Sequence, residues 1–124
     1  MKKNYSNKWI SSKQRRKQRK YRANAPLHVR HNLISAHLDK PLRKDYKRRS
    51  VPLKKGDEVK VMCGSYKKKE GKITRIDMKS LKVYVDNVKK KKVSGQEIEV
   101  PIDPSNLKII KLNLDDPKRF SRKK

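Results

Sequence analysis

The sequence predicts a mainly β fold, a small closed or nearly closed antiparallel barrel that is preceded by a basic arm and two short helices. Three observations lead to this prediction. The 124 residues suffice for one small domain with extensions. From Val51 onward apolar and polar residues alternate, which is the period of half-buried strands. Glycine, proline, asparagine and serine divide this region into about five short segments, a spacing typical of small β-barrels.

The charge of the chain points to a polyanionic partner. The sequence has 38 Lys and Arg against 12 Asp and Glu, a formal net charge of +26. Self-repulsion on this scale opposes compaction, so we expect nucleic acid, or less readily an anionic membrane surface, to neutralise it. Membrane insertion is not expected, because the sequence has no apolar run of about 18 residues and its basic N-terminus lacks the apolar region of a signal peptide.

Residues 1–24 are predicted to form a basic RNA-binding arm. No carboxylate precedes Asp39, and residues 11–22 are almost wholly polar and cationic. Without a partner this composition is also typical of a disordered, solvated tail. In the cell we expect the arm to become ordered against phosphates, because its cations are too dense for the solvent face of an ordinary helix. Tyr5, Trp9 and Tyr21 could stack on bases or anchor the arm on a protein.

Residues 25–48 are predicted to form two short helices. In the first, Val29, Leu33 and Ala36 recur at a spacing that places them on one helix face. Asp39 is a suitable N-cap for the second, in which Pro41 comes early. Neither helix is long enough to be stable alone, so both must pack against another part of the chain.

Residues 49–112 carry the alternation that predicts the barrel, and residues 113–124 are interpreted as a tail. The inward-facing side chains are expected to be Val59, Val61, Cys63, Leu81, Val83, Val85, Ile98, Val100, Ile102, Leu107 and Ile109. Ile73 and Ile76 have opposite parity, which predicts a bulge or a strand end between them. At roughly 60 residues such a core is marginal, in line with dependence on a partner.

No catalytic constellation is recognisable, and neither an enzyme nor a cofactor nor a metal is expected. The histidines His28, His31 and His37 have no cysteine or carboxylate at metal-ligand spacing. Cys63 is predicted to be a buried structural thiol. The acidic pairs Asp57-Glu58 and Asp115-Asp116 are adjacent in sequence, so their side chains would diverge on a strand. No phosphate-binding P-loop is present.

The stretch "KKGDEVKVMCGSYKKKEGKITRID" (residues 54–77) resembles a KOW motif, the strand–loop–strand element of SH3-like barrels in ribosomal proteins and transcription elongation factors. Two strands would hold a short loop in which glycines allow tight turning, and Lys67, Lys68 and Lys69 would present cations to a phosphate backbone. The motif usually has glycine where this chain has Lys68. Either the lysine adopts positive φ at a cost of about 1 kcal/mol, or the loop follows another path.

Longer segments resemble the archaeal and eukaryotic form of the L-twenty-four family of large-subunit ribosomal proteins (L-twenty-six in eukaryotes). They are "NAPLHVRHNLISAHLDKPLRKDYKRRSVPLKKGDEVKVMCGSYKKKEGKI" and "VPIDPSNLKIIKLNLDDPKR". The resemblance implies an SH3-like barrel and a cytoplasmic protein of the large subunit that supports early assembly. It implies binding to the 5′ region of the large rRNA and to neighbouring ribosomal proteins near the nascent-chain exit tunnel, where nascent chains or targeting factors would be further partners. A short C-terminal tail favours an archaeal source, and no homo-oligomer is expected.

The predicted RNA-binding residues follow from the charge pattern together with this resemblance. In the arm and the helical segment they are Lys13, Arg15, Arg16, Lys17, Arg19, Lys20, Arg22, Asn24, His28, Arg30, His31, Arg48 and Arg49. In the barrel they are Gly64, Ser65, Tyr66, Lys67, Lys68, Lys69, Gly71, Lys72, Lys89, Lys90, Lys91 and Lys92. Tyr66 could stack on a base or close the barrel as a lid, and the run Lys89–Lys92 could be an RNA contact or a solvated loop.

Three other functions fit parts of the sequence. A transcription elongation factor usually joins its KOW barrel to an α/β domain, for which this chain has no room. A DNA-compacting protein could use the basic arm equally well but would not need a barrel with a helical segment. An interaction module for acidic proteins would not require stacking aromatic residues. None of them accounts for a resemblance that runs along nearly the whole chain.

Overall fold

The fold is that of a computed structural model, which describes residues 5–6, 8, 11–116 and 119–120. Trp9, one of the three aromatic residues assigned to the arm, lies outside the described residues. The described helices are α1 (Arg15–Asn24), α2 (Leu27–Leu33), α3 (Lys40–Tyr46) and the 3-10 helix η1 (Pro104–Asn106). The described strands are β1 (Ser35–Leu38), β2 (Ser50–Pro52), β3 (Glu58–Val61), β4 (Glu70–Asp77), β5 (Lys82–Val85), β6 (Lys89–Lys91), β7 (Glu97–Glu99) and β8 (Leu107–Lys111).

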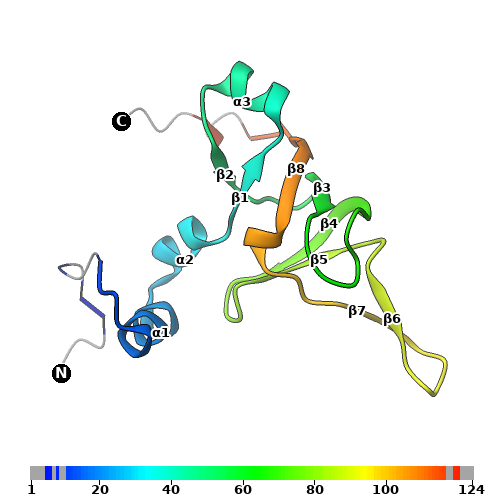
Figure 1. Cartoon of the computed structure of the whole chain (residues 1–124), viewed down its shortest axis with the longest axis horizontal. Coiled ribbons are helices and arrows are strands. Elements are labelled where there is room, and N and C mark those ends of the chain that lie inside the picture. Colours follow the sequence, from blue (N-terminus) through cyan, green and yellow to red (C-terminus); the bar gives the residue numbers. More distant parts are fainter. Residues whose placement is uncertain (1–4, 7, 9–10, 117–118, 121–124) are drawn as a thin grey trace.

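Six strands form the main sheet, in the order β2-β1-β8-β3-β4-β5 (Figure 1). All neighbouring pairs are antiparallel except β1 and β8, which run parallel, with His37 opposite Lys108. Within the described residues β2 and β5 remain at the two edges, so the sheet does not close into a barrel. The domain is therefore small and mainly β, as predicted, whereas the closed, wholly antiparallel arrangement is not what the structure shows.

The hydrophobic core lies within the main sheet and confirms most of the predicted alternation. Val59, Val83, Leu107 and Ile109 are fully buried. The register between β4 and β5 shifts between Ile73 and Arg75, which confirms the predicted irregularity in that strand. Inward-facing apolar side chains from β1, β3, β5 and β8 thus hold the sheet together through the burial of apolar surface.

Two positions expected to face inward do not. Cys63 is exposed, because β3 ends at Val61 and the chain turns away from the sheet before the cysteine. Ile98 is 41% exposed, because β7 pairs only with β6 in a separate hairpin. The prediction of a buried thiol at Cys63 was therefore wrong. Of the alternating positions Ile98, Val100 and Ile102, only Ile98 is exposed.

The helical segment contains a strand that the sequence analysis missed. Helix α2 ends at Leu33, and Ser35–Leu38 forms β1, in which Ala36 and Leu38 are buried. Helix α3 agrees with the prediction, since the carboxylate of Asp39 accepts a hydrogen bond of 2.8 Å from the backbone N–H of Lys40.

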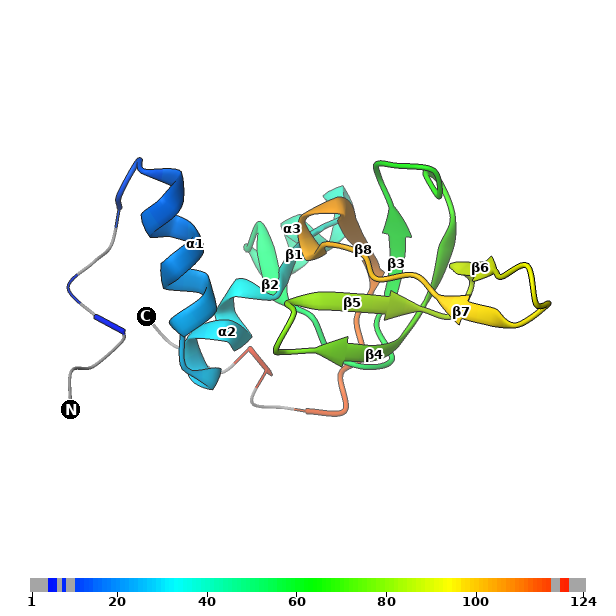
Figure 2. The ribbon, with the colours of Figure 1, turned by 90° about the horizontal axis from the view of Figure 1, so that it is seen from below.

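The basic arm is helical over Arg15–Asn24, although none of its side chains is buried. Density of charge did not exclude a helix, because Arg, Lys, Gln and Ala all have high intrinsic helix propensity. The chain therefore presents its cations around an ordered helix rather than along a disordered tail. Helix α1 lies at one end of the molecule, and the β6–β7 hairpin projects from the other (Figures 1 and 2).

The segment interpreted as a tail contributes to the packing of the domain. Arg119 places its guanidinium against the fully buried carboxylate of Asp57. The ring of Phe120 stacks on that of Tyr46, with ring centroids 4.6 Å apart. The polypeptide after β8 thus returns to the start of β3 and to α3.

Candidate nucleic-acid interface

Three basic features project from the β domain. The first, the basic helix, consists of the cations of α1. The second, the lysine loop, is Gly64–Lys69 between β3 and β4. The third, the lysine hairpin, consists of β6, β7 and their connection. All three carry exposed cationic side chains.

The basic helix exposes all its cationic side chains: Arg15, Arg16, Lys17, Arg19, Lys20 and Arg22. Lys13, just before it, is exposed as well. Tyr21 is half-buried, because its hydroxyl lies 2.8 Å from that of Tyr5 and the two ring centroids are 5.1 Å apart. This hydrogen bond raises the pKa of Tyr5. Tyr5 and Tyr21 therefore form a small aromatic pair beside the basic helix and do not present two separate rings.

The lysine loop is ordered by its own backbone. Lys67 donates its N–H to the carbonyl of Gly64 at 3.1 Å, and Lys68 donates to the carbonyl of Val61 at 2.9 Å. Lys68 has φ of +72°, so the lysine adopts the left-handed conformation at the position where the motif usually has glycine. The first of the two alternatives therefore holds, and the strained backbone fixes a third adjacent cation in the loop.

Two residues of the predicted site have structural roles at the base of the loop. Tyr66 is half-buried, packs against the core and donates its hydroxyl to the carbonyl of Lys89 at 3.4 Å. The centroid of its ring also lies 5.3 Å from the ammonium of Lys69. The packing of Tyr66 against the core agrees with the lid interpretation. A Cβ on Gly71 would come within 2.2 Å of a carboxylate oxygen of Asp86, so only glycine fits where β4 crosses this side chain.

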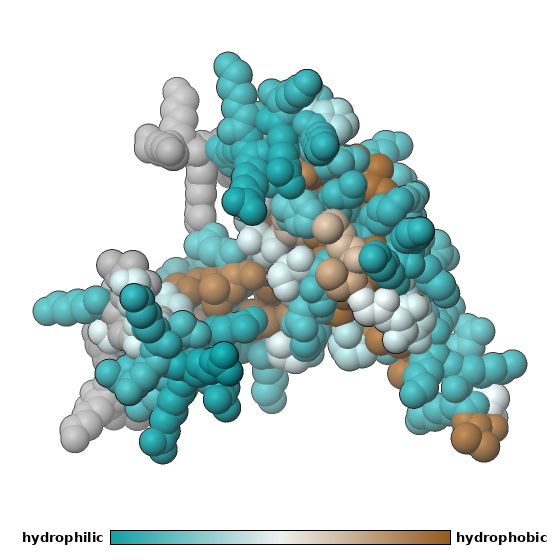
Figure 3. All heavy atoms as spheres, in the orientation of Figure 1, coloured by the Kyte–Doolittle hydropathy of each residue, from teal (hydrophilic) through white to brown (hydrophobic). Residues whose placement is uncertain are grey.

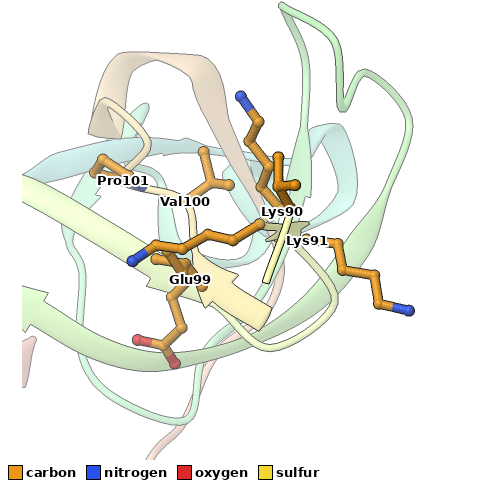
Figure 4. Close-up of a pocket in the computed structure, with 8 residues that line it drawn as sticks. Lys90, Lys91, Glu99, Val100 and Pro101 are labelled. Carbon is orange, nitrogen blue, oxygen red and sulfur yellow. The ribbon is translucent and has the colours of Figure 1, made fainter. Parts of the chain in front are cut away.

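The lysine hairpin replaces what the sequence suggested was a loop. Lys89–Lys91 forms β6, and Lys89 pairs with Glu97 across the hairpin at 3.4 Å. Beside it lies a pocket of about 510 Å³ whose lining includes Val93, Ile98, Val100 and Pro101. Figure 4 shows Lys90 and Lys91 near Glu99, Val100 and Pro101, with the lysine ammonium groups pointing in different directions. Val93 is fully exposed in the connection, and Figure 3 shows a hydrophobic tip there on an otherwise hydrophilic projection.

The cations of these three features are clustered, and most of them lack the carboxylate neighbours that several main-sheet lysines have. On the main sheet, lysines face carboxylates: Lys60 with Glu70 at 2.6 Å, Lys82 with Asp103 at 2.6 Å and Lys108 with Asp39 at 3.1 Å. Among the described residues, no carboxylate forms an ion pair with the cations of the basic helix, with Lys67–Lys69 or with Lys90–Lys92. These three features therefore present clusters of unpaired cations that an extended polyanion could neutralise.

The remaining predicted residues fall into two groups. His28, His31, Arg49 and Lys72 are exposed, and Lys72 lies 3.9 Å from Glu58. Asn24, Arg30 and Arg48 are half-buried and form intramolecular contacts. The guanidinium of Arg30 donates only to backbone carbonyls, and that of Arg48 donates to the carbonyl of Phe120 at 3.3 Å. Sequence alone gives no signal that separates such arginines from those that face solvent.

The structure also identifies charged residues that the sequence analysis did not assign. Arg43 donates to the carbonyl of Leu38 at 2.7 Å, which anchors α3 on the end of β1. Burial, followed by the charges of Arg43 and Lys108, lowers the pKa of His37. The backbone N–H of Lys40 and the ammonium of Lys108 lower the pKa of Asp39. This corner of the sheet therefore favours a neutral histidine beside an ionised aspartate.

Neither a metal centre nor a membrane span emerges from the described part of the chain. Within the described ranges, His, Cys, Asp and Glu side chains form no cluster of three or more suited to hold a metal ion. Over the same residues, every helix is too short or too polar to cross a membrane.

The fold and the charge distribution define a small basic β protein with cationic projections, a class suited to binding an extended polyanion. A comparison with protein families makes this specific. The family model that describes the eukaryotic ribosomal proteins L26 and their archaeal counterparts of the L-twenty-four type matches residues 12–123. The chain belongs to this ribosomal protein family. It is accordingly a structural protein of the large ribosomal subunit in the cytoplasm and not an enzyme.

Proposed function

We propose that the protein clamps the 5′ region of the large-subunit rRNA between its basic helix and its lysine loop. The observation that carries this proposal is the clustering of unpaired cations. Carboxylates pair with Lys60, Lys82 and Lys108 of the main sheet, whereas the neighbouring cations of α1 and of Lys67–Lys69 have no carboxylate partner within the described part of the chain. Phosphates would supply the missing counter-charge and would also relieve the repulsion between adjacent cations.

The β3–loop–β4 unit is proposed to act as a KOW motif on an SH3-like sheet. Its support is the ordered loop between two paired antiparallel strands, in which Lys68 adopts the positive φ that glycine would ordinarily supply. A rigid loop loses little conformational freedom on binding, so more of the attraction between its lysines and phosphates appears as affinity. Gly64, Ser65 and the Lys67–Lys69 run would lie against the RNA, with Tyr66 bracing them from below.

The basic helix is proposed to follow grooves between rRNA helices. In A-form RNA the major groove is deep and narrow, so recognition depends on backbone shape, 2′-hydroxyls and unpaired bases. Arginines suit bidentate contact with phosphates. The contacts would come from Lys13 and the six cations of α1, and would continue through Asn24, His28, His31, Arg48 and Arg49.

The lysine hairpin is proposed to contact rRNA through Lys90–Lys92. Its exposed Val93 and Ile98 would then face neighbouring ribosomal proteins or, near the exit of the nascent-chain tunnel, nascent chains and targeting factors. A protein that joins distant rRNA segments in this way would support early assembly of the subunit. These locations rest on the family membership together with the projection of the hairpin from the domain.

Sedimentation in high salt provides the first test. A lysate would be fractionated on a sucrose gradient and the protein followed by immunoblot. An integral rRNA clamp stays with the large subunit. Movement to the top of the gradient, or sedimentation with RNA polymerase, would contradict the proposal.

Titration with a transcript of the 5′ region of the large rRNA provides the second test. With on the order of 10 phosphate contacts, log affinity should fall against log salt with a slope of roughly −7 or steeper. A slope near about −2 would show that most of the exposed cations do not contact phosphates.

A further inference from the structure

Arg30, in α2, joins three segments of backbone through its guanidinium. Its Nε donates to the carbonyl of Ala25 at 2.8 Å, and its Nη2 donates to the carbonyl of Ala23 at 2.5 Å. Its Nη1 donates to the carbonyls of Met78 and Lys79 at 3.2 and 3.1 Å. One side chain therefore connects the end of α1, the link to α2 and the turn between β4 and β5.

The contact with Ala23 satisfies a group that a helix end leaves open. The last carbonyls of an α-helix have no partner within the helix, and the same end carries partial negative charge. Arg30 supplies both a donor and a positive charge there. Most helices are held on their domain by the burial of apolar side chains. No side chain of α1 is buried, so the hydrogen bonds of Arg30 provide a polar attachment for the basic helix instead.

The turn that receives Arg30 is itself held in shape. Asp77 accepts hydrogen bonds from the N–H of Lys79 at 2.9 Å and from the hydroxyl of Ser80 at 2.6 Å. These bonds form an Asx-type turn. The carbonyls of Met78 and Lys79, which accept from Arg30, thus belong to a turn that has hydrogen bonds of its own. The connection runs from the sheet, through the turn and Arg30, to the basic helix.

We infer that Arg30 is a positioning residue that fixes the orientation of the basic helix on the β domain, and that it raises rRNA affinity without itself contacting phosphate. This inference rests on the proposed function in one respect, the binding of RNA by α1. The chemistry requires arginine, because lysine cannot donate in one plane to four carbonyls that belong to separate segments. We therefore place Arg30 outside the set of direct RNA contacts to which the charge pattern and the family resemblance had assigned it.

The orientation can be measured without RNA. Nitroxide labels on the exposed Cys63 and on a Lys17→Cys substitution report the distance between the lysine loop and α1. We expect one narrow distance distribution in the parent protein and a broad one after Arg30→Ala or Arg30→Lys. Unchanged narrow distributions in both variants would overturn the inference.

The salt dependence of binding to the 5′ rRNA transcript separates positioning from contact. Arg30→Ala and Arg30→Lys should each weaken binding by about tenfold, the effect of having to order a loosened segment, with the slope nearly unchanged. The matched control Arg19→Ala removes an exposed cation of α1 and should reduce the slope by about 0.7 to 0.9 units. A comparable loss of slope for Arg30→Ala, or parent-like affinity for Arg30→Lys, would overturn the inference.

Two further readouts keep the test interpretable. Thermal unfolding of each variant shows whether the β domain is intact, and Arg30→Lys serves if Arg30→Ala fails to fold. If the parent protein does not bind the transcript, the proposed function fails. The label distances still decide whether Arg30 positions the helix.

Discussion

Asp57 and Arg119 form a two-pronged ion pair inside the domain, although they lie 62 positions apart along the chain. The two guanidinium nitrogens of Arg119 lie 2.6 and 2.5 Å from the two carboxylate oxygens of Asp57. The side chains of Arg119 and Asp57 are 2% and 0% exposed. Asp57 also accepts from the backbone N–H groups of Lys54 and Asn113, so every oxygen of this buried carboxylate has partners.

Breaking this pair should destabilise the fold strongly. Arg119→Ala leaves the carboxylate of Asp57 buried without its counter-charge, which we expect to lower the free energy of unfolding by about 3 to 5 kcal/mol. Urea denaturation measures this loss. Lys54→Ala is the control, since its pair with Asp116 is partly exposed and should contribute less than about 1 kcal/mol. Equal losses in the two variants would contradict a special role for the buried pair.

Lys68→Gly should not destabilise the protein. Glycine adopts positive φ without the strain that lysine carries, so we expect the free energy of unfolding to stay constant or to rise by about 1 kcal/mol. Lys67→Gly is the matched control: its residue has no positive φ, and we expect a loss of about 0.5 to 1 kcal/mol. Thermal unfolding distinguishes the two. A clear loss for Lys68→Gly would show that the loop tolerates lysine without strain.

Neutralising the lysine loop should reduce the salt dependence of RNA binding. Replacing Lys67, Lys68 and Lys69 together by glutamine should flatten the slope by about 2 to 3 units, because each phosphate contact contributes about 0.7 to 0.9. Replacing three exposed lysines elsewhere, at positions 44, 55 and 111, is the control and should leave the slope nearly unchanged. Equal slopes for the two triple variants would remove the loop from the interface.

Acid should weaken the fold in two stages. The pKa of His37 is lowered from its ordinary 6.5 by burial and then by Arg43, Lys108 and Arg49, against a smaller opposing effect of Asp39. The unfolded chain therefore binds a proton at higher pH than the folded one. The stability present above pH 6.5 is lost as pH falls through the folded pKa. Asp39 and Asp77 also have lowered pKa values, so a second loss begins below their ordinary 3.8.

Substitution identifies the histidine responsible for the first stage. His37→Gln should remove the decline in the free energy of unfolding that starts near pH 6.5, and the decline below pH 3.8 should remain. His31→Gln, at an exposed position, is the control and should leave both stages in place. Urea denaturation at intervals across this range measures both. A first stage that persists in His37→Gln would assign it to another group.

The strand pattern was predictable for β3, β5 and β8. Val59, Val83 and Leu107 belong to strands with two neighbours in the sheet or with a covered inner face, and there alternation reports burial directly. Strand β1 was missed because Leu33 and Ala36, three residues apart, also fit a helix. The alternation that distinguishes the strand, with Ala36 and Leu38 buried, spans only four residues.

The candidate site was predictable in its charge and not in its partners. The sequence shows that Arg19, Arg30 and Arg119 carry the same charge. The fold exposes the first, attaches the second to backbone carbonyls and buries the third against a carboxylate. These outcomes depend on which groups the topology brings within hydrogen-bonding distance, and sequence composition holds no record of such distances. Membership of the ribosomal protein family did not depend on such distances. It follows from similarity of sequence along nearly the whole chain.

The place of β8 in the sheet sets an order of events during synthesis. This strand lies between β1 and β3, yet it is the last strand of the described chain to leave the ribosome. Until it emerges, β1 and β3 have unpaired edges that face each other across the gap that β8 will fill, and such edges invite pairing with other chains. Each newly made copy is therefore most exposed to mispairing while β8 is still unmade, and this interval closes when β8 enters the sheet.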